Sequence, residues 1–206
     1  MNSIRSGSTN SSSVNSLTTR QRWSTYLTIV LTTAALAAGV LLRSNVENAT
    51  RLFEDKVTGI STRYPTNWLL ERGSTASDFV FRAQDSAALP FKTTLSVSIV
   101  PIGPNATVYD VAELLTLRRA QSLASYTSLS ITPITLANGS AATQMNYAFA
   151  APKTNPVLQS LPIVVSASDV IVLSKGQAII ATFQSDAQTV DQNRHYFDAF
   201  LRRLTF

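Results

Sequence analysis

The sequence contains no cysteine, which excludes disulfide bridges, thiolate metal sites and a cysteine nucleophile. Its single histidine, His195, excludes a histidine-rich metal site. The seven glycines form neither a Walker loop nor the G-x-G-x-x-G pattern that binds dinucleotide phosphates. The chain therefore lacks the motifs by which most cofactor-dependent enzymes are identified.

Charged residues are also scarce, at 14% of the chain, and the carboxylates show no calcium-loop spacing. The net charge of +5 comes from scattered basic residues whose only adjacent pairs are Arg118-Arg119 and Arg202-Arg203. Both pairs lie in predicted helices, where arginine usually faces solvent. No basic stripe or nucleic-acid motif is present. The sequence thus predicts no nucleic-acid partner, no bound metal and no cofactor.

The surroundings of His195 give little support for catalysis. The residue lies in a C-terminal stretch with a helical period, where an imidazole that faces solvent or bonds within the helix is the ordinary case. A serine hydrolase built around it would need a serine and a carboxylate within hydrogen-bond reach, and no G-x-S-x-G motif is present. We therefore predict that the protein is not an enzyme, and a membrane-bound hydrolase around His195 is the alternative to test.

A long uncharged run, residues 23–42, is the most prominent feature that the sequence does have. At about 1.5 Å rise per residue, a helix of this length crosses the roughly 30 Å hydrocarbon core of a bilayer. Arginines flank the run on both sides, and Trp23 and Tyr26 stand where amphipathic rings favour the headgroup layer. The sequence predicts a polar N-terminal tail at residues 1–22 and one transmembrane helix at residues 23–42.

A cleaved signal peptide and a buried core helix fit this run less well. Ala35-Leu36-Ala37 matches a signal-peptidase site, but the run is long for the core of a cleaved signal peptide. A buried helix of a globular core rarely needs so many apolar residues. The flanking basic residues are nearly balanced in number, and large domains translocate largely regardless of charge. We therefore expect a single-pass cell-membrane protein with a cytoplasmic N-terminus and an extracytoplasmic C-terminal domain on the periplasmic side.

Small side chains form a stripe along the predicted span. Thr28, Thr32, Ala35 and Gly39 recur at i, i+4, i+7 and i+11, which places them on one helix face. Small residues let two helix backbones approach closely within a membrane, although they are also common in spans that pack against nothing. We predict that these four residues form a helix-packing interface with integral membrane subunits.

The rest of the chain is predicted to form a short linker at residues 43–56 and one α+β domain at residues 57–206. Strict alternation at residues 94–100 is typical of a strand that is covered on one side. Asn138-Gly139 and Lys175-Gly176 each separate two β-prone stretches, as in antiparallel hairpins. We predict an antiparallel sheet of six to eight strands with helices packed on it.

Two helices are expected in this domain. Thr107 and Asp110 have the spacing of a capping box, and the helical period that follows runs to about Ser125. Asp186 is a candidate N-cap for the last helix, whose apolar residues recur at helical spacing up to Leu204.

The order of these elements resembles the PsbP-like domain family. The resemblance is carried by Y-P-T-N-W at residues 64–68, T-T-L-S-V-S-I-V at residues 93–100, the N-G hairpin, G-Q-A-I-I-A-T-F at residues 176–183 and the closing F-L-R-R-L-T-F. It covers residues 57–206 and would make the chain a membrane-anchored member of a family that includes the extrinsic photosystem II subunit and bacterial extracytoplasmic proteins. It implies a central antiparallel sheet between helices, and a role in binding or stabilising a larger membrane assembly without catalysis.

The predicted span and this resemblance together favour a non-catalytic, single-pass accessory subunit that stabilises a larger membrane protein complex. Respiratory and photosynthetic electron-transfer complexes are the candidate assemblies, and the expected partners are integral membrane subunits and the lipid bilayer. The alternative is an independent membrane-anchored, extracytoplasmic ligand-binding module. An open, apolar-lined pocket in the domain would favour that alternative, since a stabilising subunit needs none.

Overall fold

The computed structural model describes residues 19–47, 49–74, 77–152 and 161–206. Most of the predicted polar tail, residues 1–18, lies outside the described residues. The chain divides into two compact units, Met1–Asn48 and Ala49–Phe206. The boundary between the units lies inside residues 43–56, but the prediction that this segment is a linker is wrong: helix α1 (Thr19–Glu47) extends into it, and strand β1 (Thr50–Glu54) of the second unit lies within it.

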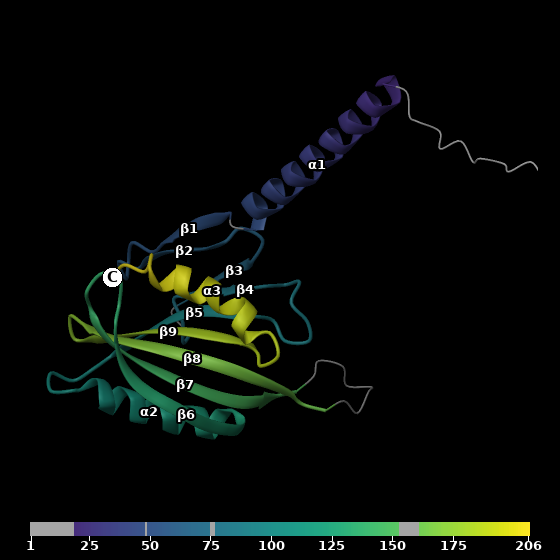
Figure 1. The fold of residues 1–206 in the computed structure, drawn as a ribbon. Coiled ribbons are helices and arrows are strands. Elements are labelled where there is room, and N and C mark those ends of the chain that lie inside the picture. The colour runs from purple at the N-terminus through teal and green to yellow at the C-terminus, as the bar shows by residue number, and fades with distance from the viewer. Residues whose placement is uncertain (1–18, 48, 75–76, 153–160) are drawn as a thin grey trace, which may run out of the picture. The chain divides into compact units, whose positions relative to one another are not determined.

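The first unit contains one long helix, α1 (Thr19–Glu47; Figure 1). Its described side chains from Trp23 to Val40 are all exposed, and the large apolar ones among them are 55% to 71% exposed. Three threonine hydroxyls donate to the carbonyl oxygen four residues earlier: Thr28 to Ser24, Thr32 to Thr28 and Thr33 to Ile29. The polar atoms of these side chains are therefore satisfied within the helix.

Within the part of the chain that the structure describes, no helix combines the length and the apolar character that crossing a membrane requires. The helix predicted at residues 23–42 is confirmed, but its assignment as a transmembrane span is not supported. Its threonine hydroxyls make transfer to hydrocarbon less favourable than that of a purely aliphatic helix. The side chains of Leu41 and Leu42, with which the predicted span ends, lie outside the described residues.

The second unit is built on a seven-stranded sheet in which all neighbouring strands are antiparallel (Figure 1). The strand order is β3-β4-β5-β9-β8-β7-β6, and a separate antiparallel hairpin of β1 and β2 precedes it. The antiparallel α+β architecture predicted from the sequence is confirmed. The strands are β1 (Thr50–Glu54), β2 (Ser61–Pro65), β3 (Leu69–Arg72), β4 (Phe81–Gln84), β5 (Thr94–Pro101), β6 (Ala124–Thr135), β7 (Ala141–Ala151), β8 (Ile163–Ser174) and β9 (Gln177–Asp186).

One face of the sheet is covered by helix α3 (Val190–Leu201) and the β1–β2 hairpin (Figure 1). Apolar side chains that alternate along β5 and β9 point into this core. The centroid of the Phe81 ring lies 4.9 Å from that of Phe53, 5.7 Å from that of Tyr64 and 5.6 Å from that of Phe200. Phe81 thus joins the sheet, the hairpin and α3 in one hydrophobic core.

Helix α2 (Val108–Ser122) covers part of the opposite face, where its buried apolar side chains pack on β7, β8 and β9 (Figure 1). The predicted capping box is confirmed. The Thr107 hydroxyl accepts from the Asp110 N–H at 3.3 Å, and the Asp110 carboxylate accepts from the Thr107 N–H at 2.7 Å. The helix ends slightly before the predicted Ser125 because β6 has already begun there.

Replacing Thr107 by alanine removes the side-chain acceptor at the start of α2. We expect the free energy of unfolding to fall by about 1 kcal/mol, which is the usual cost of a lost N-cap. Urea unfolding followed by circular dichroism measures the change. Thr116→Ala is the matched control, because the Thr116 hydroxyl donates to the Ala112 carbonyl inside the helix and adds little stability there. Equal losses in the two variants would contradict the capping role.

Both predicted hairpin turns are confirmed. Gly139 lies between β6 and β7 with a φ of 83°, and Lys175 and Gly176, between β8 and β9, have φ values of 51° and 76°. At Lys175 and Gly176 both central residues have positive φ, as a two-residue type I′ turn requires, and glycine adopts it without strain. The two-residue turn between β8 and β9 fixes the register of these strands. The connection between β6 and β7 spans residues 136–140, and that pair of strands contains register shifts.

The N-cap predicted at Asp186 is wrong. Helix α3 begins at Val190, with Thr189 in the N-cap position and no side-chain cap hydrogen bond. The Asp186 carboxylate instead accepts from the Gln188 N–H at 2.9 Å. Asp186 therefore closes the turn after β9, a local hydrogen bond that a short carboxylate makes as readily as a helix cap.

Candidate functional site

A polar basin of about 300 Å³ lies on the face of the sheet that α2 partly covers. Its walls come from β4, β5 and β9, from the segments that precede β4 and β5, and from α2. Hydroxyl, amide and charged side chains make up most of its lining. The lining residues are Asp78, Phe79, Arg82, Gln84, Phe91, Lys92, Thr94, Ser96, Ser98, Arg119, Thr182 and Gln184.

The strand register explains why polar side chains gather in the basin. Arg82 pairs with Ser96, Ser96 with Thr182, and Thr182 with Asp169, so one polar row crosses four neighbouring strands. Residues between these positions, such as Leu95, point to the opposite face and into the core around α3. The alternation seen in the sequence therefore builds an apolar face and a polar face of the same strands.

A buried ion pair stands behind the basin. Nη2 of Arg119 lies 2.6 Å from Oδ2 of Asp169, whose side chain is fully buried, whereas that of Arg119 is 17% exposed. Oδ1 of Asp169 accepts from the Thr182 hydroxyl at 2.7 Å and from the Tyr147 hydroxyl at 3.4 Å. The Arg119 guanidinium also lies over the Tyr147 ring, 4.7 Å from its centroid. One arginine of α2 thereby contacts residues of β7, β8 and β9.

Burial dominates the electrostatics of this cluster. Desolvation raises the pKa of Asp169, and the charge of Arg119 and the hydrogen bond from Thr182 offset part of that rise. Burial, followed by the charge of Asp169, raises the pKa of Tyr147 well above its usual value. The tyrosine thus stays protonated and keeps its hydroxyl as a donor to the carboxylate. The arrangement acts as a structural link between α2 and the sheet.

The expectation that Arg119 lies on a solvated helix face is wrong. Asp169 supplies the signal that could have corrected it, because the one charged residue of a largely apolar strand needs a cation or hydrogen-bond donors when it is buried. The sequence does not identify the cation that pairs with Asp169. Arg118 and Arg119 are neighbours, and only the seating of α2 on the sheet turns Arg119 inward and leaves Arg118 exposed.

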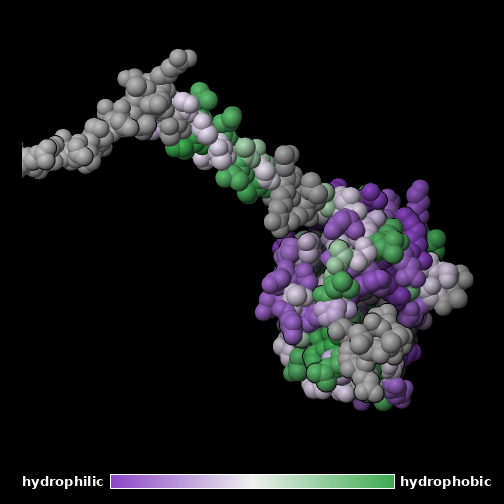
Figure 2. All heavy atoms as spheres, turned by 90° about the vertical axis from the view of Figure 1, so that its right-hand side faces the viewer, coloured by the Kyte–Doolittle hydropathy of each residue, from purple (hydrophilic) through white to green (hydrophobic). Residues whose placement is uncertain are grey.

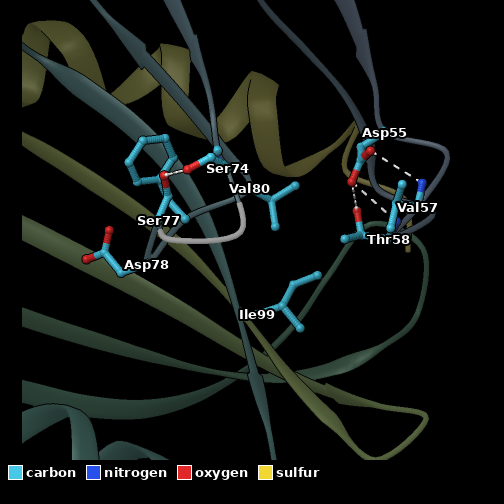
Figure 3. A pocket seen from close by; sticks show the side chains of 10 residues that line it. Asp55, Val57, Thr58, Ser74, Ser77, Asp78, Val80 and Ile99 are labelled. Atoms are coloured by element: carbon cyan, nitrogen blue, oxygen red, sulfur yellow. Dashed lines mark hydrogen bonds between the residues drawn. The ribbon is translucent and has the colours of Figure 1, made fainter.

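A second hollow, of about 490 Å³, lies between the β1–β2 turn and the segment from β3 to β4 (Figure 3). Val80 and Ile99 contribute apolar side chains to its lining. Residues 75 and 76, which join two of the lining residues, lie outside the described part of the chain. The hollow is open and largely apolar, which is the feature expected of a ligand-binding module.

Several polar groups around this hollow form hydrogen bonds within two separate turns (Figure 3). Asp55 accepts from the N–H groups of Val57 and Thr58, at 3.3 and 3.2 Å, and from the Thr58 hydroxyl. The bond from the Thr58 hydroxyl is the largest cause of the lowered pKa of Asp55. Ser74 and Ser77 share a hydrogen bond of 3.1 Å. These groups stabilise the turns that frame the hollow.

His195 is an exposed residue of α3. Its Nδ1 lies 2.6 Å from the Gln192 carbonyl oxygen, and its ring centroid lies 3.9 Å from that of Tyr196. Among the described residues, neither a serine nor a carboxylate forms a hydrogen bond with His195, so the arrangement that the hydrolase alternative requires is missing from this part of the chain. The same residues contain no group of three or more histidine and acidic side chains that could hold a metal ion.

The four residues predicted as a helix-packing interface all lie on α1 and are exposed there: Thr28, Thr32, Ala35 and Gly39. A Cβ atom added at Gly39 would meet no atom within 4 Å. The two threonine hydroxyls are turned back to the helix backbone. The stripe is therefore a shallow surface that a neighbouring helix could approach without leaving a hydroxyl unpaired.

Comparison with known proteins finds likeness in structure and none in sequence: no family model and no curated protein matches the chain. CyanoP, the cyanobacterial PsbP of Synechocystis sp. PCC 6803, is similar with a TM-score of 0.54 at 16% identity, over 76% of this chain and 92% of that one. LpqN, involved in cell envelope biogenesis of Mycobacterium tuberculosis, is similar with a TM-score of 0.52 at 12% identity, over 76% and 90%.

The Saccharomyces cerevisiae Ran-binding protein Mog1p is also similar, with a TM-score of 0.50 at 9% identity, over 76% of this chain and 95% of that one. At such identities the likeness concerns the fold. The resemblance to PsbP-like domains inferred from the sequence is confirmed at that level, and the chain has a PsbP/Mog1-like α+β fold.

Proposed function

We propose that the protein is a non-catalytic accessory subunit that stabilises a larger membrane protein complex, and that α1 docks it there. One observation carries the proposal: the 29-residue helix α1 exposes large apolar side chains along its described length. Figure 2 shows them as green surface on α1. An exposed apolar surface of this kind is typical of a protein or membrane contact.

The chemistry of α1 suits apolar surroundings. Each Å² of apolar surface removed from water contributes about 25 cal/mol, so covering the exposed side chains is favourable. The hydroxyls of Thr28, Thr32 and Thr33 already donate within the helix, so covering them leaves no donor without a partner. Both features support a helix that lies among other apolar helices.

Contact with other helices, in addition to lipid, would hold α1 in place. The stripe of Thr28, Thr32, Ala35 and Gly39 allows close approach, and alanine and threonine make α1 less lipophilic than a leucine-rich span. The partners are then integral membrane subunits and the surrounding bilayer of the cell membrane. Because α1, in its described residues, is not apolar enough by itself to cross a membrane, the proposed single pass, with a cytoplasmic N-terminus and an extracytoplasmic domain, depends on these helix contacts. The proposed assembly is a respiratory or photosynthetic electron-transfer complex, on the sequence resemblance to a family that includes a photosystem subunit.

Two matched variants of α1 test the docking role. Ala35→Leu enlarges a residue of the stripe, whereas Ala37→Leu makes the same change about 180° away on the helix. We expect Ala35→Leu, like Gly39→Leu, to lower the amount of partner that co-migrates by about tenfold, the effect of about 1.4 kcal/mol of lost contact. Ala37→Leu should leave it unchanged.

The measurement is detergent extraction from native membranes, native gel separation and mass spectrometry of the proteins that co-migrate. Co-migration of the parent chain with a large integral complex is the expected result. Equal recovery of partner with Ala35→Leu and Ala37→Leu would remove the stripe from the interface. A parent chain that migrates alone would contradict the subunit role itself.

A membrane-anchored ligand-binding module is the second candidate function. It is favoured by the open hollow of Figure 3, where Val80 and Ile99 supply apolar surface in a volume of the size that small molecules occupy. The native gel separates the two candidates, because a ligand-binding module has no need of integral subunits and would migrate as a lone species.

A further inference from the structure

The polar basin holds hydrogen-bonding groups that the fold does not use. The hydroxyls of Ser96 and Ser98 and the amide of Gln84 are half-buried and line the basin. None of the three side chains forms a hydrogen bond with another side chain in the described ranges. Half-buried donors and acceptors of this kind are satisfied by water or by a ligand.

Two cations of the basin lack a strong carboxylate partner. Lys92 is exposed and forms no ion pair with the residues that the structure describes. Arg82 lies 3.5 Å from the Glu71 carboxylate and 3.8 Å from that of Asp78, whose side chain is 90% exposed. The Arg82 guanidinium also lies over the ring of Phe79, 3.8 Å from its centroid, which keeps it in the basin. Exposed ion pairs contribute about 0–1 kcal/mol, so Arg82 can exchange its carboxylate partners for an anionic ligand while it stays on this ring.

The back wall of the basin is rigid by comparison. Arg119 is held by the buried carboxylate of Asp169, and the Thr182 hydroxyl donates to the same carboxylate. Phe91 adds an apolar wall at one side. The basin therefore has a back wall held by a buried ion pair, and two cationic side chains whose carboxylate partners are weak or missing.

The chemistry of these groups selects a class of ligand. Hydroxyl and amide side chains pair with ligand hydroxyls, and an ammonium and a guanidinium pair with a carboxylate or a phosphate. A volume of about 300 Å³ lies at the small end of ligand pockets. We propose that the polar basin binds a small sugar that carries a carboxylate or a phosphate group. This site is independent of the docking role of α1.

In the bound state the anionic group lies at Lys92 and Arg82. The sugar hydroxyls pair with Ser96, Ser98 and Gln84 along the floor of the basin.

Isothermal titration calorimetry of the full chain in mild detergent tests this site with glucuronate, glucose 6-phosphate and neutral glucose. We expect at least one acidic sugar to bind saturably below about 10 mM, and glucose to bind at least about tenfold more weakly. Failure of both acidic sugars to saturate overturns the proposal. Equal binding of glucose overturns the role of the cations, and equal binding of inorganic phosphate overturns the role of the hydroxyl floor.

A charge-matched pair of variants completes the test. Lys92→Gln should weaken binding of the acidic sugar by about tenfold, since it removes a charge-assisted hydrogen bond. Lys56→Gln removes the same charge from the β1–β2 turn, outside the basin, and should leave the affinity unchanged. Equal weakening in both variants would assign the affinity to net charge and overturn the site.

Discussion

Substitution of Arg119 by methionine should lower the free energy of unfolding by about 3–5 kcal/mol, because it leaves the buried Asp169 carboxylate without its cation. Methionine keeps an unbranched side chain over the Tyr147 ring, so the packing changes less than the charge does. The hydrogen bonds from the Thr182 and Tyr147 hydroxyls remain, but two neutral donors do not balance a full charge. Urea unfolding at about pH 7 measures the loss.

The loss of stability should increase with pH, and this direction would identify the buried Asp169 carboxyl group as its cause. Burial raises the pKa of Asp169 above its usual value of 3.8, so between 3.8 and the raised pKa the folded protein keeps a proton that the unfolded chain releases. The stability that this group contributes therefore decreases as pH rises through that window. Removing Arg119 raises the pKa of Asp169 further and extends the window upward. We expect the deficit of the variant to be smaller at about pH 5 than at about pH 7.

A double variant separates the buried charge from lost packing. Arg119→Met combined with Asp169→Asn removes both charges, and it should recover most of the stability that Arg119→Met alone loses. A deficit that persists in the double variant, or that is the same at both pH values, would show that packing of the arginine stem is responsible instead.

Substitution of Phe81 by alanine should lower the free energy of unfolding by about 3–5 kcal/mol. The side chain is fully buried, and its ring contacts those of Phe53, Tyr64 and Phe200. The cavity left by the ring would lie where the sheet, the β1–β2 hairpin and α3 meet, and these elements cannot all move inward to fill it. The midpoint of urea unfolding should fall without a large change in slope.

Tyr109→Ala is the matched control for this aromatic truncation. Tyr109 is 70% exposed on α2, so its loss should change the free energy of unfolding by no more than about 0.5 kcal/mol. Phe81→Leu should lie between the two, since leucine refills part of the volume. If Phe81→Ala cost no more than Tyr109→Ala, Phe81 would not hold the three elements together.

The features of the fold that could be predicted are those decided over a few neighbouring residues. The capping box of Thr107 and Asp110 depends on two side chains three positions apart. The turns at Gly139 and at Lys175-Gly176 depend on the ability of the chain to adopt positive φ. The alternation along β5 depends only on the period of a strand. These signals were sufficient for an antiparallel α+β domain and for its resemblance to PsbP-like proteins.

The candidate site depends on residues far apart in the chain, and the sequence does not determine it. Ser96, Thr182 and Asp169 form one row only because β5, β9 and β8 are neighbours in a particular register. The polar positions of β5 are visible in the sequence as one face of an alternating strand. An alternating strand can present the same polar face to solvent. Here it lines a basin because α2 packs beside it and contributes Arg119 to the wall.

The sequence by itself determined the antiparallel α+β class, the capping box of α2, the two hairpin turns and a long uncharged helix over residues 23–42, because local geometry and hydrophobic period decide these things. Only the tertiary structure decided that Arg119 rather than Arg118 meets Asp169, and that Asp186 closes a turn instead of capping α3. A buried charge is stable only where packing brings its partner within a few ångströms, and that distance depends on the whole fold.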